Sequence, residues 1–304
     1  MAKGRAAREG CAARPFARSL ASGLPATVLF VADAYFRRHG GDDSAGTYLA
    51  SGLTAGPWSP ALQHGGPPNA LAVLIADRVV RAAGDRSDLV PLRLAADFAG
   101  PVPVGEIAVT THITRLARSA AACEVTVSAG GRECLGVRVW FVRDADTAAL
   151  ASPIPSGPPP PPADLAHRPH SSGGGWGFGY ASSLRWWFTD GAATTPGPAA
   201  AWVLPLHPIL DEQPGELPGL ARAALVADSA SGISAELDWA QWSFINVDLD
   251  LHLARPFAGE AVHLAAVTTV GDRGSALARS TISDARGPVG AGLQTLVVAP
   301  MPTA

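Results

Sequence analysis

The sequence has few cysteines and no long uncharged apolar run. Its three cysteines, Cys11, Cys123 and Cys134, are too few for a disulfide framework and lack metal-ligand spacing. They are typical of reduced thiols in a cytoplasmic protein. A bridge between Cys123 and Cys134 stays open, because both are expected on neighbouring strands. No uncharged apolar run reaches the roughly 18 residues of a transmembrane helix, so no membrane span is expected.

Charge is also sparse. Charged residues make up 16% of the 304 residues and the net charge is -3, which lacks the basic footprint of nucleic-acid binding. His167 and His170 have no acidic or cysteine neighbours at ligand spacing, so neither a metal nor a cofactor is expected. A hydrophobic content of 47% supports a substantial core, and the length suits two domains.

Two segments differ in composition from the rest. Residues 1–25 are rich in Arg and Ala, and we predict a disordered N-terminal segment there. Residues 152–162 contain seven prolines, and residues 171–175 are Ser and Gly. We interpret 151–176 as a linker, stiff at first and flexible later, between domains at 26–150 and 177–300.

The first domain alternates β-like and helical patterns. Strands are predicted at 26–36 and 45–53 around a polar turn at 37–43, a helix at 69–83, and strands at 107–113, 121–128 and 134–142. The second domain repeats this order, with strands at 183–188 and 199–206, a helix at 218–233 and β-like sequence from 244 to 298.

Matched residues indicate that the two domains are copies of one unit. Pro67 and Asp77 lie 151 positions before Pro218 and Asp228, and later matches have offsets of 154 to 156. A helix followed by an antiparallel meander must bury its apolar side on a sheet. We therefore predict an α+β fold of two antiparallel sheets, each wrapped round a central helix and able to pair edge to edge.

This order resembles the hotdog fold, and the tandem form resembles the acyl-CoA thioesterase II-like family. The residues that carry the likeness are Trp58, His64-Gly65-Gly66-Pro67-Pro68, Ala227-Asp228-Ser229, Asn246-Val247-Asp248-Leu249, Arg255-Pro256, Gly259-Glu260 and Gln294. The resemblance implies a double hotdog enzyme of lipid metabolism, whose substrate is an acyl-CoA and whose nucleophile is an activated water.

The family's water-binding residues are an Asp, a Thr or similar polar residue, and a Gln, all in the second hotdog. They fall on Asp228, Asn246 and Gln294. Asn246 departs from the pattern, because it offers an amide where a hydroxyl is usual. The sequence around Asp228 supports this assignment, because an Asp in mid-helix after apolar neighbours is unfavourable unless it is hydrogen-bonded or functional.

The first copy keeps Asp77 but has Arg138 at the position aligned with Gln294 and approximately Pro91 at that of Asn246. We therefore expect the chemistry to be concentrated in the second copy.

His64, Gly65 and Gly66 are predicted to bind substrate. Glycines allow close backbone approach, and the free N–H groups at a helix start can polarise a thioester carbonyl. A tight turn entering the helix explains the glycines almost as well. His64 is predicted to contact substrate or fix the loop, without an acid–base role.

Other interpretations stay open. A non-catalytic acyl-thioester binder is one alternative, favoured by the departure of Asn246 from the family's pattern. An enoyl-thioester hydratase is another, but it requires an Asp and a His close in sequence near a helix start, and the second copy has no such pair. Alternation along a strand explains Asp248 and Asp250 as well as acid–base work does. The Trp186-Trp187-Phe188 cluster could line an acyl tunnel or pack in the core. A monomer or a homo-oligomer associating through sheet faces is compatible with the sequence.

Overall fold

The computed structural model describes residues 33–153, 156–168, 177–212 and 216–301. The predicted disordered segment at 1–25, with Cys11, and the histidine at 170 lie outside these residues. Within them, none of the helices has the length and apolar character needed to cross a bilayer.

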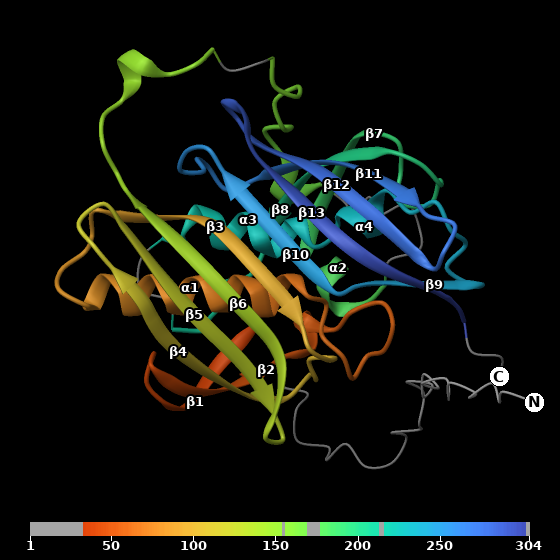
Figure 1. The fold of residues 1–304 in the computed structure, drawn as a ribbon. Helices are drawn as coiled ribbons and strands as arrows, with labels where there is room; N and C mark the ends of the chain where they lie inside the picture. Colours follow the sequence, from red (N-terminus) through yellow and green to blue (C-terminus); the bar gives the residue numbers. More distant parts are fainter. Residues whose placement is uncertain (1–32, 154–155, 169–176, 213–215, 302–304) are drawn as a thin grey trace, which may run out of the picture.

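One antiparallel sheet of thirteen strands dominates the described part of the chain (Figure 1). The strands of the first half are β1 (Phe36–Gly41), β2 (Ala45–Ala50), β3 (Leu89–Phe98), β4 (Glu106–Leu116), β5 (Ala120–Ala129) and β6 (Arg132–Arg143). Those of the second half are β7 (Leu184–Asp190), β8 (Ala199–Pro205), β9 (Trp242–Asn246), β10 (Asp248–Leu253), β11 (Val262–Val270), β12 (Ser275–Asp284) and β13 (Gly287–Pro300).

The strand order is that of two related halves. It runs β1-β2-β4-β5-β6-β3 and then β10-β13-β12-β11-β8-β7, with β9 pairing on β13. When β3 is matched to β10, each strand on one side of the seam has its counterpart at the same distance on the other side. The strands form one continuous sheet instead of two separate ones, because β3 and β10 pair directly, with Ala95 opposite Asp250. This seam satisfies two edges that would otherwise be exposed.

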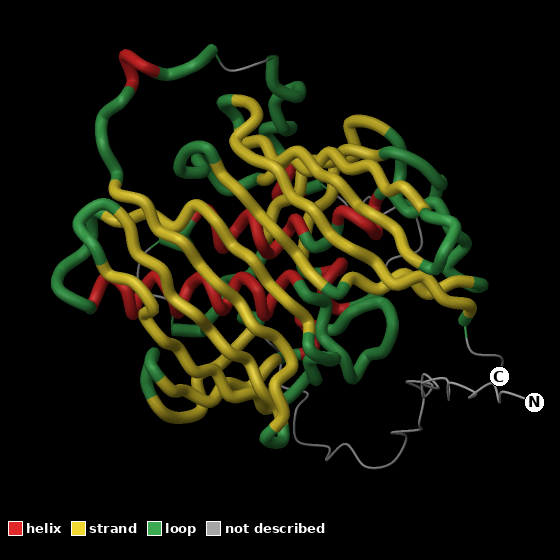
Figure 2. Tube along the Cα trace, viewed as in Figure 1, coloured by secondary structure: helices red, strands yellow, loops and turns green. Residues whose placement is uncertain are grey.

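The helices lie on one face of this sheet, and each half contributes one long helix (Figure 2). They are α1 (Gly66–Ala82), α2 (Gly179–Ser182), α3 (Gly219–Ala227) and α4 (Ala230–Ile233). Helix α1 begins with two prolines in its first turn, where their missing N–H groups cost nothing. Both long helices are rich in buried apolar residues, so they form the core between the curled halves.

The start of the first half differs from the prediction. The segment at 37–43, expected to be a turn, largely belongs to strand β1, which begins at Phe36. Phe36 is buried and pairs with Ala50, while the following residues alternate in exposure. As β1 lies at the edge of the sheet, polar residues are tolerated on its exposed side.

The described part of the proline-rich segment contacts the second half. The Trp202 indole Nε1 donates to the Pro159 carbonyl at 2.7 Å, and the Arg168 guanidinium lies 4.1 Å from the centre of the Trp187 ring. Cys123 and Cys134 lie on neighbouring strands β5 and β6 as buried free thiols.

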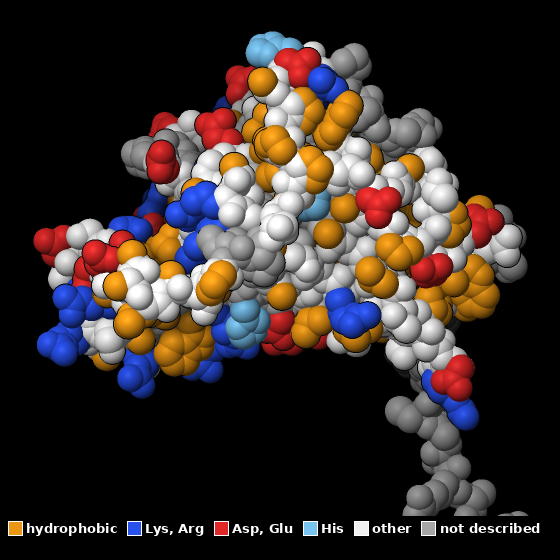
Figure 3. All heavy atoms as spheres, turned by 90° about the horizontal axis from the view of Figure 1, so that it is seen from above, with side chains coloured by type: hydrophobic (Ala, Val, Ile, Leu, Met, Phe, Trp, Pro, Cys, Tyr) orange, Lys and Arg blue, Asp and Glu red, His pale blue; other side chains and the backbone are white. Residues whose placement is uncertain are grey.

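On the face seen in Figure 3, surface hydrophobic residues are interspersed with polar ones. In Figure 3, seen from above, hydrophobic side chains occur singly or in small groups among charged and uncharged atoms. The second half carries several exposed apolar side chains on β12 and β13, such as Leu277, Leu293 and Val297.

Candidate active site

Asp228 lies at a break between two helices, whereas the sequence predicted a continuous helix over 218–233. Helix α3 ends at Ala227, Asp228 is its C-cap, and α4 begins at Ala230. A carboxylate at a helix C-terminus opposes the helix dipole, so other groups must offset its charge. Asp228 is also 95% buried, which increases that requirement (relative exposure 5%).

Two side-chain amides supply hydrogen bonds to this carboxylate. Asn246 Nδ2 donates to Asp228 Oδ1 at 2.8 Å, and Gln294 Nε2 donates to the same oxygen at 3.2 Å. The backbone N–H of Ser231 donates to Gln294 Oε1 at 3.2 Å, which fixes the orientation of the amide. The three residues predicted from the sequence therefore meet in one place, around one carboxylate oxygen.

Strand pairing explains why they meet. Asn246 ends β9, where it pairs with Leu296 on β13, two positions beyond Gln294. Alternate residues of a strand share a face, so Gln294 and Leu296 both point inward. Asn246 Nδ2 also donates to the Asp248 carbonyl at 3.1 Å, across the irregular step from β9 to β10.

His64 approaches the second carboxylate oxygen from the first half. Its Nδ1 lies 3.0 Å from Asp228 Oδ2 and 3.1 Å from the Gly66 backbone nitrogen. A ring with hydrogen on Nδ1 donates to Asp228, whereas a ring with hydrogen on Nε2 accepts from Gly66. Burial lowers the pKa of His64, and the Asp228 charge opposes that effect only in part. Burial therefore favours the neutral imidazole at this site.

Two further residues at this site were missed by sequence reasoning. The Tyr180 ring stacks on His64, with centroids 3.8 Å apart and an interplanar angle of 8°. Its hydroxyl donates to the Leu225 carbonyl at 2.7 Å and lies 2.8 Å from Ser229 Oγ. Tyr180 follows a glycine-rich stretch, and no helical or strand periodicity marks it, so no local pattern indicates its role. Ser229 adjoins Asp228, and that proximity was its only signal.

Gly65 and Gly66 are required by close packing between the two helices. A Cβ on Gly65 would lie 2.7 Å from Asp228 Oδ2, and a Cβ on Gly66 would lie 2.2 Å from the Leu225 carbonyl oxygen. Both distances are far below van der Waals contact. The glycines thus bring the N-terminus of α1 against the C-terminus of α3. Because Pro67 and Pro68 have no N–H, the N–H groups at this end of α1 are those of Gly65 and Gly66.

The equivalent position in the first half is organised differently. Asp77 Oδ2 accepts from Arg81 Nε at 2.7 Å, a pair one helical turn apart. Pro91 pairs with Phe141 as Asn246 pairs with Leu296, which supports the predicted correspondence of Pro91 and Asn246.

The predicted correspondence of Arg138 and Gln294 is wrong by one residue. Arg138 pairs with Ala95 and Leu293 pairs with Asp250, so Arg138 matches Leu293. Gln294 then matches Val139, and both side chains are buried. A shift of one residue turns a side chain to the opposite face of a strand. The error arose from aligning Gly136 with Gly292.

The other acidic pair serves strand pairing. Asp248 accepts from the backbone and hydroxyl of Thr295, and Asp250 pairs with Arg93 at 3.2 Å. Of the tryptophans, Trp186 is buried, while Trp58 and Trp239 stack 5.2 Å apart and join loops of the two halves.

An antiparallel sheet wrapped round helices, with a carboxylate held between two related halves, defines a protein of the hotdog class. Family models for the acyl-CoA thioesterase N-terminal and C-terminal domains match residues 54–142 and 155–298. The chain belongs to this acyl-CoA thioesterase family.

Solved structures agree on the fold. Similar ones are a tesB protein of Mycobacterium avium subspecies paratuberculosis (13% identity, TM-score 0.61, 86% of this chain and 96% of that chain covered) and the acyl-CoA thioesterase II TesB2 of Mycobacterium marinum (14%, 0.60, 88% and 96%). A hot dog protein of unknown function from Alicyclobacillus acidocaldarius is similar too (14%, 0.64, 87% and 96%). No curated protein matches the sequence.

Proposed function

We propose that this protein is a double hotdog thioesterase that hydrolyses acyl-CoA to the free acid and CoA with a water activated at Asp228. The observation that carries the proposal is the Asp228 carboxylate itself. It is buried, accepts hydrogen bonds from Asn246 and Gln294, and lies against the start of α1.

In this mechanism, water attacks the thioester carbonyl carbon while Asp228 accepts its proton. The tetrahedral intermediate then breaks its C–S bond, and the CoA thiolate takes up the proton from Asp228. Asn246 and Gln294 hold the carboxylate, and the Asn246 side-chain oxygen is available to orient the water. An amide can therefore fill the role for which the family uses a hydroxyl.

The backbone N–H groups of Gly65 and Gly66, at the start of α1, are suited to bind the developing oxyanion. The tautomer of His64 decides whether the Gly66 N–H is available. A hydrogen on Nδ1 donates to Asp228 and leaves the Gly66 N–H free for the carbonyl oxygen. We therefore assign Gly65 and Gly66 to substrate binding and His64 to positioning Asp228, in addition to any contact with substrate.

The test is release of free CoA, followed with a thiol reagent, from short, medium and long acyl-CoAs. We expect turnover that is lost in Asp228→Asn while the far-ultraviolet circular dichroism is unchanged. Absence of CoA release across all chain lengths would reject the proposal, and tight binding without turnover would favour a non-catalytic binder.

One contact favours a second candidate, an enoyl-thioester hydratase. His64 and Asp228 form an Asp–His pair in space at the start of α1, although they are far apart in sequence. Loss of the conjugated-thioester absorbance of crotonyl-CoA without CoA release would support this reaction, and a constant absorbance would exclude it.

A further inference from the structure

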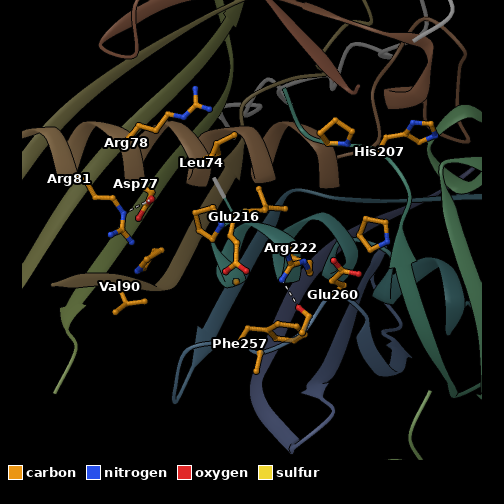
Figure 4. A pocket seen from close by; sticks show the side chains of 18 of the residues that line it. Leu74, Asp77, Arg78, Arg81, Val90, His207, Glu216, Arg222, Phe257 and Glu260 are labelled. Carbon is orange, nitrogen blue, oxygen red and sulfur yellow. Dashed lines mark hydrogen bonds and ion pairs between the residues drawn. The ribbon is translucent and has the colours of Figure 1, made fainter. Parts of the chain in front are cut away.

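A cavity among the described residues lies away from Asp228, at the position that the internal repeat relates to it. It encloses about 990 Å³ between α1 and the start of α3. Figure 4 shows Asp77 and Arg81 on one wall and Arg222, Phe257 and Glu260 on the other. Pro91, the counterpart of Asn246, also lines it. Its volume falls within the range of small-molecule sites.

The cavity contains polar groups without partners among the described residues. Asp77 is 93% buried (relative exposure 7%), and its Oδ1 has no hydrogen-bond partner there, although Oδ2 holds Arg81. Arg78 Nη2 is likewise buried without an acceptor. Such groups are costly unless a ligand or solvent satisfies them. Asp77 Oδ1 offers an acceptor on the side of α1 that faces α3, whereas the Arg78 side chain extends from the other side of the helix (Figure 4).

The start of α3 supplies further donors. Pro218 is its N-cap and makes no side-chain cap, so the first amides of this nine-residue helix lack both intrahelical and capping partners. Gly219 lies at the cavity wall, as Gly66 lies at the other site. These N–H groups can donate hydrogen bonds to a carbonyl oxygen. Leu74, Val90 and Phe257 provide apolar surface beside them.

From this arrangement we infer that the cavity is a second binding site for an acyl thioester, which it holds without hydrolysing. The inference rests on the proposed function of the Asp228 site. The thioester carbonyl accepts from the α3 amides, the acyl chain lies on the apolar wall, and an amide N–H of the pantetheine arm donates to Asp77. Pro91 and Val139 give Asp77 no amide donors, so no water is held in the reactive position.

The experiment measures binding stoichiometry of the full chain by calorimetry. The probe is an S-(2-oxoalkyl) analogue of the best-cleaved acyl-CoA, in which a methylene between sulfur and carbonyl prevents hydrolysis. We expect two molecules bound per chain. Ala258→Phe, which fills the cavity, should reduce this to one and leave kcat within about twofold of wild type. Glu260→Trp is a second filling variant at an exposed position and should do the same.

A stoichiometry of one in the wild type would overturn the inference, as would two bound molecules in both folded variants. Steady CoA release alongside a stoichiometry of one would leave the proposed function intact. Conversely, two bound molecules in a protein that never releases CoA from its substrates would reject the hydrolytic function but not the second site.

Discussion

Asp77 and Asp228 occupy matching places in the two halves but have different surroundings. Asp228 is held by two amides on one oxygen and by an imidazole on the other. Among the described residues, Asp77 Oδ2 pairs with Arg81 of its own helix and Oδ1 has no hydrogen-bond partner, and Asp77 lines a cavity. The carboxylate is common to both halves, so the difference in expected chemistry comes from the donors around it and not from the acid.

The largest effect should come from exchanging the two carboxylates for amides in turn. Asp228→Asn removes the base and should lower kcat by about a hundred- to ten-thousand-fold. Asp77→Asn is the matched control and should change kcat less than about twofold. Steady-state CoA release checks both, and similar losses in the two variants would place the chemistry in the wrong half.

The second-largest effect should come from replacing Gln294 with valine, the residue that stands at the matching position 139 of the first half. Gln294→Val removes an amide that positions Asp228 and should lower kcat about a hundredfold, since small misplacements cost that much. The reverse change, Val139→Gln, buries an amide without partners and should lower the free energy of unfolding by about 1–3 kcal/mol. Urea denaturation measures the second effect, and an unchanged midpoint would contradict the assignment of Val139.

A smaller loss is expected at Asn246. Asn246→Ala removes a hydrogen bond to a charged group, worth about 1.5–3 kcal/mol, so kcat/KM should fall about ten- to a hundredfold. Asn246→Thr restores a donor and should recover most of the activity. If Thr is no better than Ala, the amide has a role that a hydroxyl cannot fill.

The smallest effect concerns pH. Burial lowers the pKa of His64 below its ordinary 6.5, so the native state stays neutral where the unfolded chain binds a proton. Stability should therefore fall as the pH drops through about 6.5 toward the lower native pKa. His64→Gln should show a shallower decline in melting temperature over this range than wild type, and parallel declines would argue against the shift.

Most of the topology could be predicted from the sequence, because hydrophobic periodicity and repeated residues are local signals. Helix and strand order could be predicted in this way, whereas the grouping of Asp228, Asn246 and Gln294 was predicted from the family resemblance. The break between α3 and α4 could not, because Leu225 to Ile233 reads as continuous helix and only tertiary hydrogen bonds reveal the interruption.

Two other features could be recognised only in the structure. Arg138, and not Val139, was predicted as the counterpart of Gln294. A misalignment of one residue turns a side chain to the opposite face of a strand, and the few identical residues of a diverged repeat cannot reveal such a shift. Tyr180 reaches His64 only through the path of a short segment between the halves, which has no periodicity. Contacts between distant segments, including His64 with Asp228, depend on packing that no local pattern encodes.

The β3–β10 seam has a consequence for behaviour on dilution. The Asp228 site takes its helix N-terminus from one half and its carboxylate from the other. Because one chain carries both, the halves meet at a fixed effective concentration, whatever the amount of protein in solution. The internal contacts of this site therefore do not depend on association between chains, and the two halves cannot be lost to exchange between molecules.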